Sequence, residues 1–189
     1  MSMPVIVLPL SYRRPAYKAA MAAAHVDPLV VGRVIGDVVD LFVPTVAVSA
    51  RFGAKDLTNG CEIKPSVAAA APAVLIAGRA NDLFTLVMTD PDAPSPSEPT
   101  MRELLHWYGG ETVVPYVGPR PPVGIHRYVL VVYQQKARVT APPSLAPATE
   151  ATRARFSNRA FADRHDLGLP VAAMFFNAQK ETASRRRHY

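Results

Sequence analysis

Runs of hydrophobic residues along this chain predict a domain built mainly from β-strands. Between 46 and 52, larger apolar side chains alternate with small or polar ones, as expected for a strand with one buried face. The runs 83–89 and 128–134 are almost continuously apolar, which predicts strands that are buried on both faces. Shorter strands are expected over 74–77 and 171–177.

Two short helices are expected beside these strands. Asp27 can cap a helix over 28–35, whose first residue is a proline. Ser157 can cap a second helix, which is expected to end near Leu167 with Gly168 as its terminator. The pattern therefore predicts a sheet-dominated fold with few helices.

Length and composition agree with a single domain. A chain of 189 residues with 49% hydrophobic residues can form one core, and 19 prolines against 10 glycines favour rigid turns over a helical bundle. We expect the domain to cover 27–181, with a disordered leader over 1–26 and a basic disordered tail over 182–189. No apolar run approaches the ~20 residues of a membrane-spanning helix.

The charge and the cysteine count limit the classes of partner. The formal net charge is +6, and part of the excess lies near the two ends of the chain. Such ends attract anionic surfaces or are simply solvated, but no basic segment with interleaved aromatics is present, so direct nucleic-acid binding is not expected. The leader also has the basic, acid-free composition of an organelle-targeting segment, which remains an alternative. The single Cys61 excludes an internal disulfide and a cysteine zinc cluster, and it favours the cytosol or nucleus.

Two polar segments lead into strands and carry the candidate chemistry. The first, 90–96, contains Asp90 and Asp92 and precedes His106; the second, 118–124, precedes His126. Prolines fix the backbone of both segments. If the two histidine-bearing runs are neighbouring strands, these four side chains converge on a small polar pocket suited to an anion such as a phosphoryl group.

Several chemical interpretations of these residues are open. One carboxylate can hold its turn by accepting backbone amides, or it can orient a histidine that donates to a phosphoryl oxygen. A metal site with two histidines and one carboxylate is the alternative, although an anion pocket explains the same residues and no cofactor is expected. The chain lacks a Gly-x-Ser-x-Gly elbow, a phosphate loop and a dinucleotide fingerprint, so we do not expect an enzyme with catalytic residues.

The two polar segments resemble the signature regions of the phosphatidylethanolamine-binding protein family, in particular its plant branch and the Mother of FT and TFL subfamily. Further similar stretches are 27–38, 56–58, 65–67, 158–162, 167–173 and 176–181. The resemblance implies a mostly β fold, an antiparallel β-sandwich with a Greek-key-like core and a few short helices. Together with the residue pattern, it places around the anion pocket Asp90, Asp92, Pro94, His106, Gly118, Pro121, His126 and Tyr128.

The resemblance also implies a function. It indicates a monomeric cytoplasmic and nuclear regulator of seed dormancy, germination or flowering that binds 14-3-3 proteins and, through them, basic-leucine-zipper (bZIP) transcription factors. Arg138 lies where the plant branch carries a basic 14-3-3-contacting residue, and a plain solvated charge is the alternative for it. The alternative functions are a phospholipid-headgroup binding module and, third, a hydrolase or protease-inhibitor-like activity.

The chain departs from the family pattern after His106. Only residues 107–115 separate His106 from Tyr116, where family members place a longer apolar strand and a glycine-rich loop. We therefore expect one central strand to be truncated. Each large side chain lost from a core costs roughly 2–5 kcal/mol of a total stability of about 5–15 kcal/mol, so folding requires neighbouring segments to fill the gap. A truncated non-functional isoform is the alternative.

Overall fold

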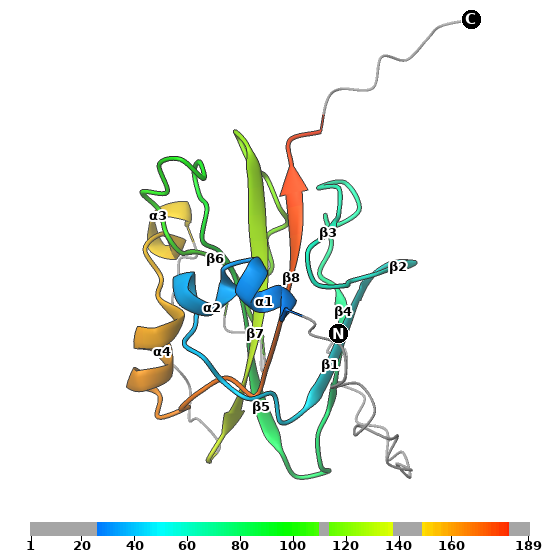
Figure 1. Ribbon diagram of the computed structural model, residues 1–189, viewed down its shortest axis with the longest axis vertical. Coiled ribbons are helices and arrows are strands. Elements are labelled where there is room, and N and C mark those ends of the chain that lie inside the picture. The colour runs from blue at the N-terminus through cyan, green and yellow to red at the C-terminus, as the bar shows by residue number, and fades with distance from the viewer. Residues whose placement is uncertain (1–25, 110–113, 138–148, 182–189) are drawn as a thin grey trace, which may run out of the picture.

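Two β-sheets and a layer of short helices form the part of the chain that the computed structural model describes, residues 26–109, 114–137 and 149–181 (Figure 1). The three-stranded sheet has the order β2 (Lys55–Asp56), β1 (Ala47–Phe52) and β4 (Ala73–Ala77). The five-stranded sheet has the order β3 (Cys61–Glu62), β8 (Ala172–Gln179), β7 (Ile125–Gln135), β5 (Leu83–Asp90) and β6 (Leu104–Gly109).

The strand pairing confirms the predicted mostly β, antiparallel sandwich. All neighbouring strands are antiparallel except β3 and β8, which are parallel. Each of the five predicted strands is present, with bounds that differ by a few residues at most. The predicted leader and tail lie outside the described residues, except for Val26.

Two hydrophobic cores lie on opposite faces of the five-stranded sheet. One fills the space between the sheets and includes Phe52 of β1 and Phe176 of β8. The other lies beneath the helices and includes Leu29 and Phe175. Strands β5 and β7 contribute to both cores, so their continuous apolar runs are buried on both faces as predicted.

The first predicted helix, 28–35, is wrong in its length. It is divided into α1 (Pro28–Val31) and α2 (Val34–Asp37). The predicted cap is confirmed, because the Leu29 amide donates to Asp27 Oδ1 at 2.8 Å. The division falls at Arg33, whose φ of 55° is left-handed and cannot continue a right-handed helix.

The helices at the other end of the sequence lie beside β6. The predicted Ser157 cap is confirmed, since its Oγ accepts the Ala160 amide at 3.2 Å at the start of α4 (Asn158–Arg164). The predicted end of this helix is wrong: α4 ends at Arg164, and Asp166, with a φ of 52°, takes the left-handed position after the C-cap His165, while Gly168 lies two residues further on. A further helix, α3 (Glu150–Arg153), was not predicted. Within the described residues, none of the helices has the length and hydropathy needed to cross a bilayer.

The strand after the shortened segment lies at the edge of its sheet. The prediction of a truncated central strand is wrong about where the strand lies. The strand β6 is the outermost strand of the five-stranded sheet and has six residues. On its outer side, Val114 forms a bridge with Tyr108, and the Val117 amide donates to the His106 carbonyl at 2.9 Å. Val114 is fully buried, so the segment that follows residues 110–113 fills the space beside β6.

Arg153 closes the remainder of this edge. Its side chain is buried, and Nη1 donates to the carbonyls of Leu105 and His106, each at 3.1 Å. Nη2 donates to the Pro115 carbonyl at 2.8 Å. The guanidinium therefore joins α3, β6 and the segment beside β6 through backbone acceptors.

We expect Arg153→Met to lower the free energy of unfolding, because it leaves buried carbonyls without this donor. The cost of one unpaired buried acceptor is about 1–3 kcal/mol, and we expect at least that loss in a urea titration. Arg155→Met, at an exposed position two residues further on, is the matched control and should change stability by less than about 0.5 kcal/mol. Equal stabilities of the two variants would contradict this role for Arg153.

Candidate functional site

The candidate site lies at one end of the five-stranded sheet, where β5 ends and β7 begins. Asp90 is the last residue of β5, His126 is the second residue of β7, and His106 lies on β6. The condition set for convergence, that the two histidine-bearing runs are neighbouring strands, is not met, because β5 separates them. The side chains still converge, because β5 places Asp90 between the two histidine strands. In addition, the ring of Tyr128 on β7 packs edge-on against the His106 ring, with 5.1 Å between the ring centroids.

Asp90 and His126 form a buried ion pair. Asp90 Oδ2 lies 2.7 Å from His126 Nδ1, and the two side chains are 3% and 0% exposed. His126 Nε2 lies 2.9 Å from the Val123 carbonyl. A carboxylate and a carbonyl only accept hydrogen bonds, so both ring nitrogens donate and His126 is an imidazolium. Burial acts to lower the pKa of His126, but the hydrogen bond and charge of Asp90 outweigh it and raise this pKa.

Asp90 performs both structural tasks proposed for a carboxylate in its segment. Its Oδ1 accepts the Asp92 amide at 2.8 Å, which holds the turn, while Oδ2 orients His126. Burial and the negative charge of Asp90 raise the pKa of the Tyr128 phenol, which stays protonated. The carboxylate is thus fully engaged with its own surroundings.

His106 has a different state from His126. Its Nδ1 donates to the Val117 carbonyl at 2.7 Å, while Nε2 has no hydrogen-bond partner among the described residues. Burial lowers the pKa of His106, so the ring is neutral and Nε2 carries a lone pair. A buried polar atom without a partner is uncommon and marks a place where a ligand can bind.

The carboxylate of Asp92 is not part of this cluster. Its oxygens accept from Arg127 three times: from the backbone amide at 2.8 Å, from Nε at 2.9 Å and from Nη2 at 2.6 Å. These hydrogen bonds outweigh burial and lower the pKa of Asp92. Arg127 Nη1 also donates to the Gly32 carbonyl and to Asp37. The prediction of Asp92 in the pocket is therefore corrected: it holds the Arg127 side chain, which in turn joins β7 to Gly32 and to Asp37 of α2.

The remaining predicted residues differ in their surroundings. Gly118 lies against backbone, because a Cβ there would be 2.8 Å from the Ala68 carbonyl oxygen. Pro121 is buried and Pro94 is half-buried. The two polar segments meet at Gly124, where a Cβ would lie 3.0 Å from the Pro96 ring. Arg138 lies outside the described residues.

A second buried polar cluster was missed by sequence reasoning. Glu103 accepts from the Asn158 amide at 2.9 Å, from Thr89 Oγ1 at 2.8 Å and from Asn158 Nδ2. Burial raises the pKa of Glu103 in spite of these donors. The cluster joins β5 and β6 to the start of α4. The only sequence signal was the capping serine, Ser157, immediately before Asn158.

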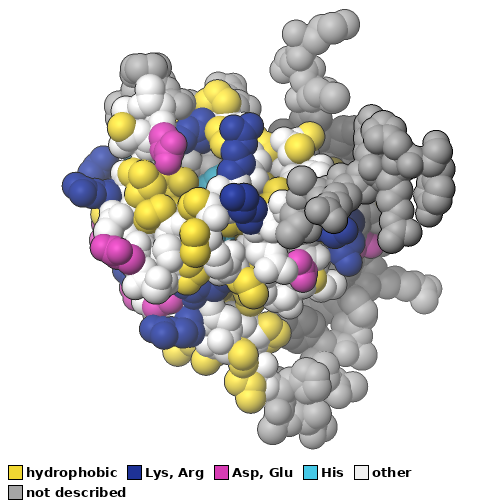
Figure 2. All heavy atoms as spheres, turned by 90° about the horizontal axis from the view of Figure 1, so that it is seen from above, with side chains coloured by type: hydrophobic (Ala, Val, Ile, Leu, Met, Phe, Trp, Pro, Cys, Tyr) yellow, Lys and Arg dark blue, Asp and Glu magenta, His cyan; other side chains and the backbone are white. Residues whose placement is uncertain are grey.

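The surface around the histidine cluster is mixed in character. Seen from this end of the sheet, a small area of histidine side chain is visible among hydrophobic and basic side chains (Figure 2). Val123 and Ile125, which flank this part of β7, are 63% and 56% exposed. Among the described residues, no group of three or more His, Cys, Asp or Glu side chains is placed to hold a metal ion.

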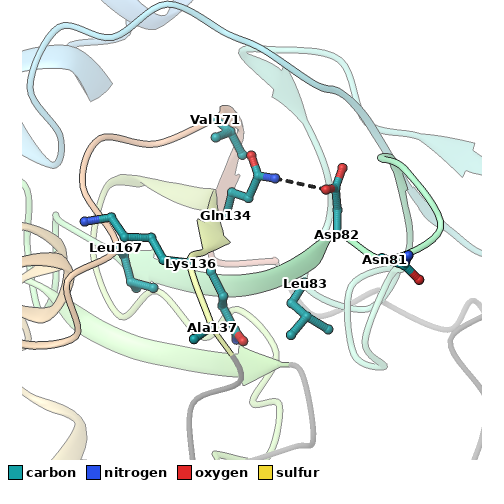
Figure 3. A pocket seen from close by; sticks show the side chains of 9 residues that line it. Asn81, Asp82, Leu83, Gln134, Lys136, Ala137, Leu167 and Val171 are labelled. Atoms are coloured by element: carbon teal, nitrogen blue, oxygen red, sulfur yellow. Dashed lines mark hydrogen bonds between the residues drawn. The ribbon is translucent and has the colours of Figure 1, made fainter.

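An open hollow of about 540 Å³ lies at the opposite end of β5 and β7 (Figure 3). It is lined by residues that include Leu83, Gln134, Lys136 and Val171, and Gln134 Nε2 donates to Asp82 Oδ1 at 3.1 Å. None of the predicted pocket residues lines it.

Comparisons with known proteins give a consistent result. A family model described as "Phosphatidylethanolamine-binding protein" matches residues 49–111 and 108–176. "Protein MOTHER of FT and TFL1 homolog 2" of Oryza sativa subsp. japonica is 56% identical over 176 residues, which cover 87% of this chain and 99% of the relative. "Protein TERMINAL FLOWER 1" of Arabidopsis thaliana is 44% identical over 179 residues, covering 88% and 98%. The structure titled "Phosphatidylethanolamine-binding protein from Plasmodium vivax" has a TM-score of 0.70 at 20% identity, covering 82% and 96%, and shows a shared fold.

We expect the two cluster histidines to titrate on opposite sides of the ordinary value of 6.5. Because the folded pKa of His126 is raised, its contribution to stability is complete below 6.5 and is lost as pH rises through the folded pKa. Because the folded pKa of His106 is lowered, its contribution is present above 6.5 and is lost as pH falls through the folded pKa.

Long-range ¹H–¹⁵N spectra check this directly. At pH 7, His126 should have protons on both ring nitrogens and His106 only on Nδ1. If both rings titrate together near the ordinary value, the proposed difference between them is wrong.

Proposed function

The chain belongs to the phosphatidylethanolamine-binding protein family, and on this premise we propose that it is a non-enzymatic regulator of plant development, acting in seed dormancy, germination or flowering. The observation that carries the proposal is the similarity to a rice protein named for the Mother of FT and TFL1 group, which extends over nearly all of that relative. The similarity to "Protein TERMINAL FLOWER 1" supports a developmental role.

The proposed mode of action is contact with other proteins. The chain acts as a monomer in the cytoplasm and nucleus, binds 14-3-3 proteins, and through them joins bZIP transcription factors. Arg138 is the proposed contact. It follows the end of β7 closely, where Lys136 is a surface residue with a 63% exposed side chain that pairs with Asp166.

The chemistry of the histidine cluster supports a non-enzymatic role. Asp90 and His126 hold each other, and His126 has no free nitrogen with which to act as a base. The serines in the nearby polar segment bond to each other, since Ser95 Oγ lies 2.9 Å from Ser97 Oγ. His106 Nε2 carries a lone pair, but among the described residues no hydroxyl or thiol is hydrogen-bonded to it, so the pairing of nucleophile and base that acyl transfer uses is not formed there.

A phospholipid-headgroup binding module is the second candidate function. The observation that favours it is His106 Nε2, a buried nitrogen without a partner among the described residues. A phosphoryl group is the ligand proposed for this position, and the buried ion pair beside it gives the pocket a fixed shape.

Replacing Arg138 by alanine is expected to weaken binding to a 14-3-3 protein, because it removes the proposed basic contact. We expect Kd to rise about tenfold, equal to roughly 1.4 kcal/mol, in surface plasmon resonance. Arg155→Ala removes an exposed arginine elsewhere and should leave Kd unchanged. An unaltered affinity of the Arg138 variant would exclude this contact.

Adding O-phosphoethanolamine to the ¹⁵N-labelled protein is expected to shift the His106 ring signals most strongly, because Nε2 is the unpaired atom. His126 should shift less, and His165, which lies at the end of α4 against Phe161, should not shift. The absence of a change at both cluster histidines would remove the headgroup function.

A further inference from the structure

We propose that the pocket binds a phosphate ester together with one proton, which is taken up at His106 Nε2. This inference rests on the proposed anion pocket and defines the ionic state of its complex. It assigns different tasks to the two histidines: His106 contacts the phosphoryl oxygen, and His126 is a positioning residue.

His126 has no hydrogen-bond donor left for a ligand. Its Nδ1 is taken by Asp90 at 2.7 Å and its Nε2 by the Val123 carbonyl at 2.9 Å. Its positive charge is also balanced by the adjacent carboxylate. The ion pair therefore offers an incoming anion neither a free donor nor a net positive charge.

His106 has a free nitrogen, but in the wrong protonation state for an anion. The Val117 carbonyl, 2.7 Å from Nδ1, requires the proton of the neutral ring to lie on Nδ1. Nε2 then carries a lone pair, and the oxygens of an ionised phosphate ester are acceptors as well. Two acceptors cannot form a hydrogen bond, so the contact needs one additional proton.

The charged groups around His106 act on its pKa in both directions: Asp90 raises it, whereas Arg153 and His126 lower it. Asp90 from β5 is negative, His126 from β7 is positive and paired with it, and Tyr128 from β7 is a neutral phenol. Arg153 from α3 is positive, and its guanidinium donates to backbone carbonyls of β6, including that of His106. A phosphate ester that enters this cluster adds negative charge beside Asp90, which stabilises an imidazolium at His106.

The proton balance differs between two kinds of phosphate ester. A monoester has a second pKa of about 6, so at pH 8 it arrives as a dianion and the proton comes from the solvent. Near pH 6, about half of the monoester already carries a proton and transfers it to Nε2. A diester, which is the linkage in a phospholipid headgroup, has no such proton, so His106 must take it from the solvent at both pH values.

Isothermal titration calorimetry of the full chain tests the proposal. O-phosphoethanolamine supplies the monoester and glycerophosphoethanolamine the diester, each in two buffers with different ionisation enthalpies. At pH 8 we expect each ester to bind with the uptake of about one proton. Linkage then requires that Kd rise about tenfold for each pH unit above pH 8. At pH 6 the uptake should fall to about one half for the monoester only.

Two variants and one spectrum locate the proton. His106→Gln places an amide near Nε2 that donates without taking up a proton, so any binding that remains should show no proton uptake. His165→Gln, outside the cluster, should behave as the wild type. In the wild-type complex at pH 8, long-range ¹H–¹⁵N spectra should show protons on both nitrogens of His106.

The outcomes separate this inference from the proposed pocket. Binding without proton uptake, or a His106 ring that stays neutral in the complex, would overturn the inference and leave the pocket in place. Binding of neither ester at either pH would overturn both.

Discussion

The polar end of the five-stranded sheet depends on the buried contact between Asp90 and His126. A carboxylate that is almost completely buried is costly to keep ionised unless a cation and further donors satisfy it. The imidazolium of His126 and the Asp92 amide provide them, and the Val123 carbonyl satisfies the remaining ring nitrogen. Because these groups satisfy one another, β5 and β7 can extend from the two apolar cores into a polar cluster. Within that cluster, His106 Nε2 is the nitrogen that has no hydrogen-bond partner among the described residues.

The same rule governs the other buried and partly buried charges. Arg127 is satisfied by Asp92 and Asp37, Arg153 by backbone carbonyls, and Glu103 by amide and hydroxyl donors. Each contact joins segments that are far apart in the sequence: β7 to the first helices, β6 to α3, and β6 to α4. The short helices have few residues to bury, so these polar contacts fix their positions on the sheet.

The sequence was sufficient to predict β1, β4, β5, β7 and β8, and most clearly β5 and β7, which are continuously apolar and buried on both faces. The two-residue strands β2 and β3 were not predicted. The sequence also identified Asp90, His106 and His126, since each lies where a polar segment meets an apolar run. It did not distinguish Asp90 from Asp92, because the two carboxylates are two residues apart and their partners, His126 and Arg127, are adjacent. The division of the first helix was equally hidden, since it occurs at Arg33, a residue type that gives no sign of a left-handed backbone. Arg153 and Glu103 were missed because a charged residue in a polar stretch gives no sign that it will be buried.

The outer side of β6 has a consequence for the solution behaviour of the protein. An edge strand with unpaired backbone groups is a template on which a second chain can add, and natural proteins cover such edges or place charges along them. Here the carbonyls of Leu105 and His106 are occupied by a guanidinium, and Tyr108 is paired with Val114. Because the guanidinium is bulky and charged and occupies these carbonyls, another strand cannot form hydrogen bonds with them. The arginine that compensates for a short strand thus also acts against aggregation, by denying neighbouring molecules an edge to extend.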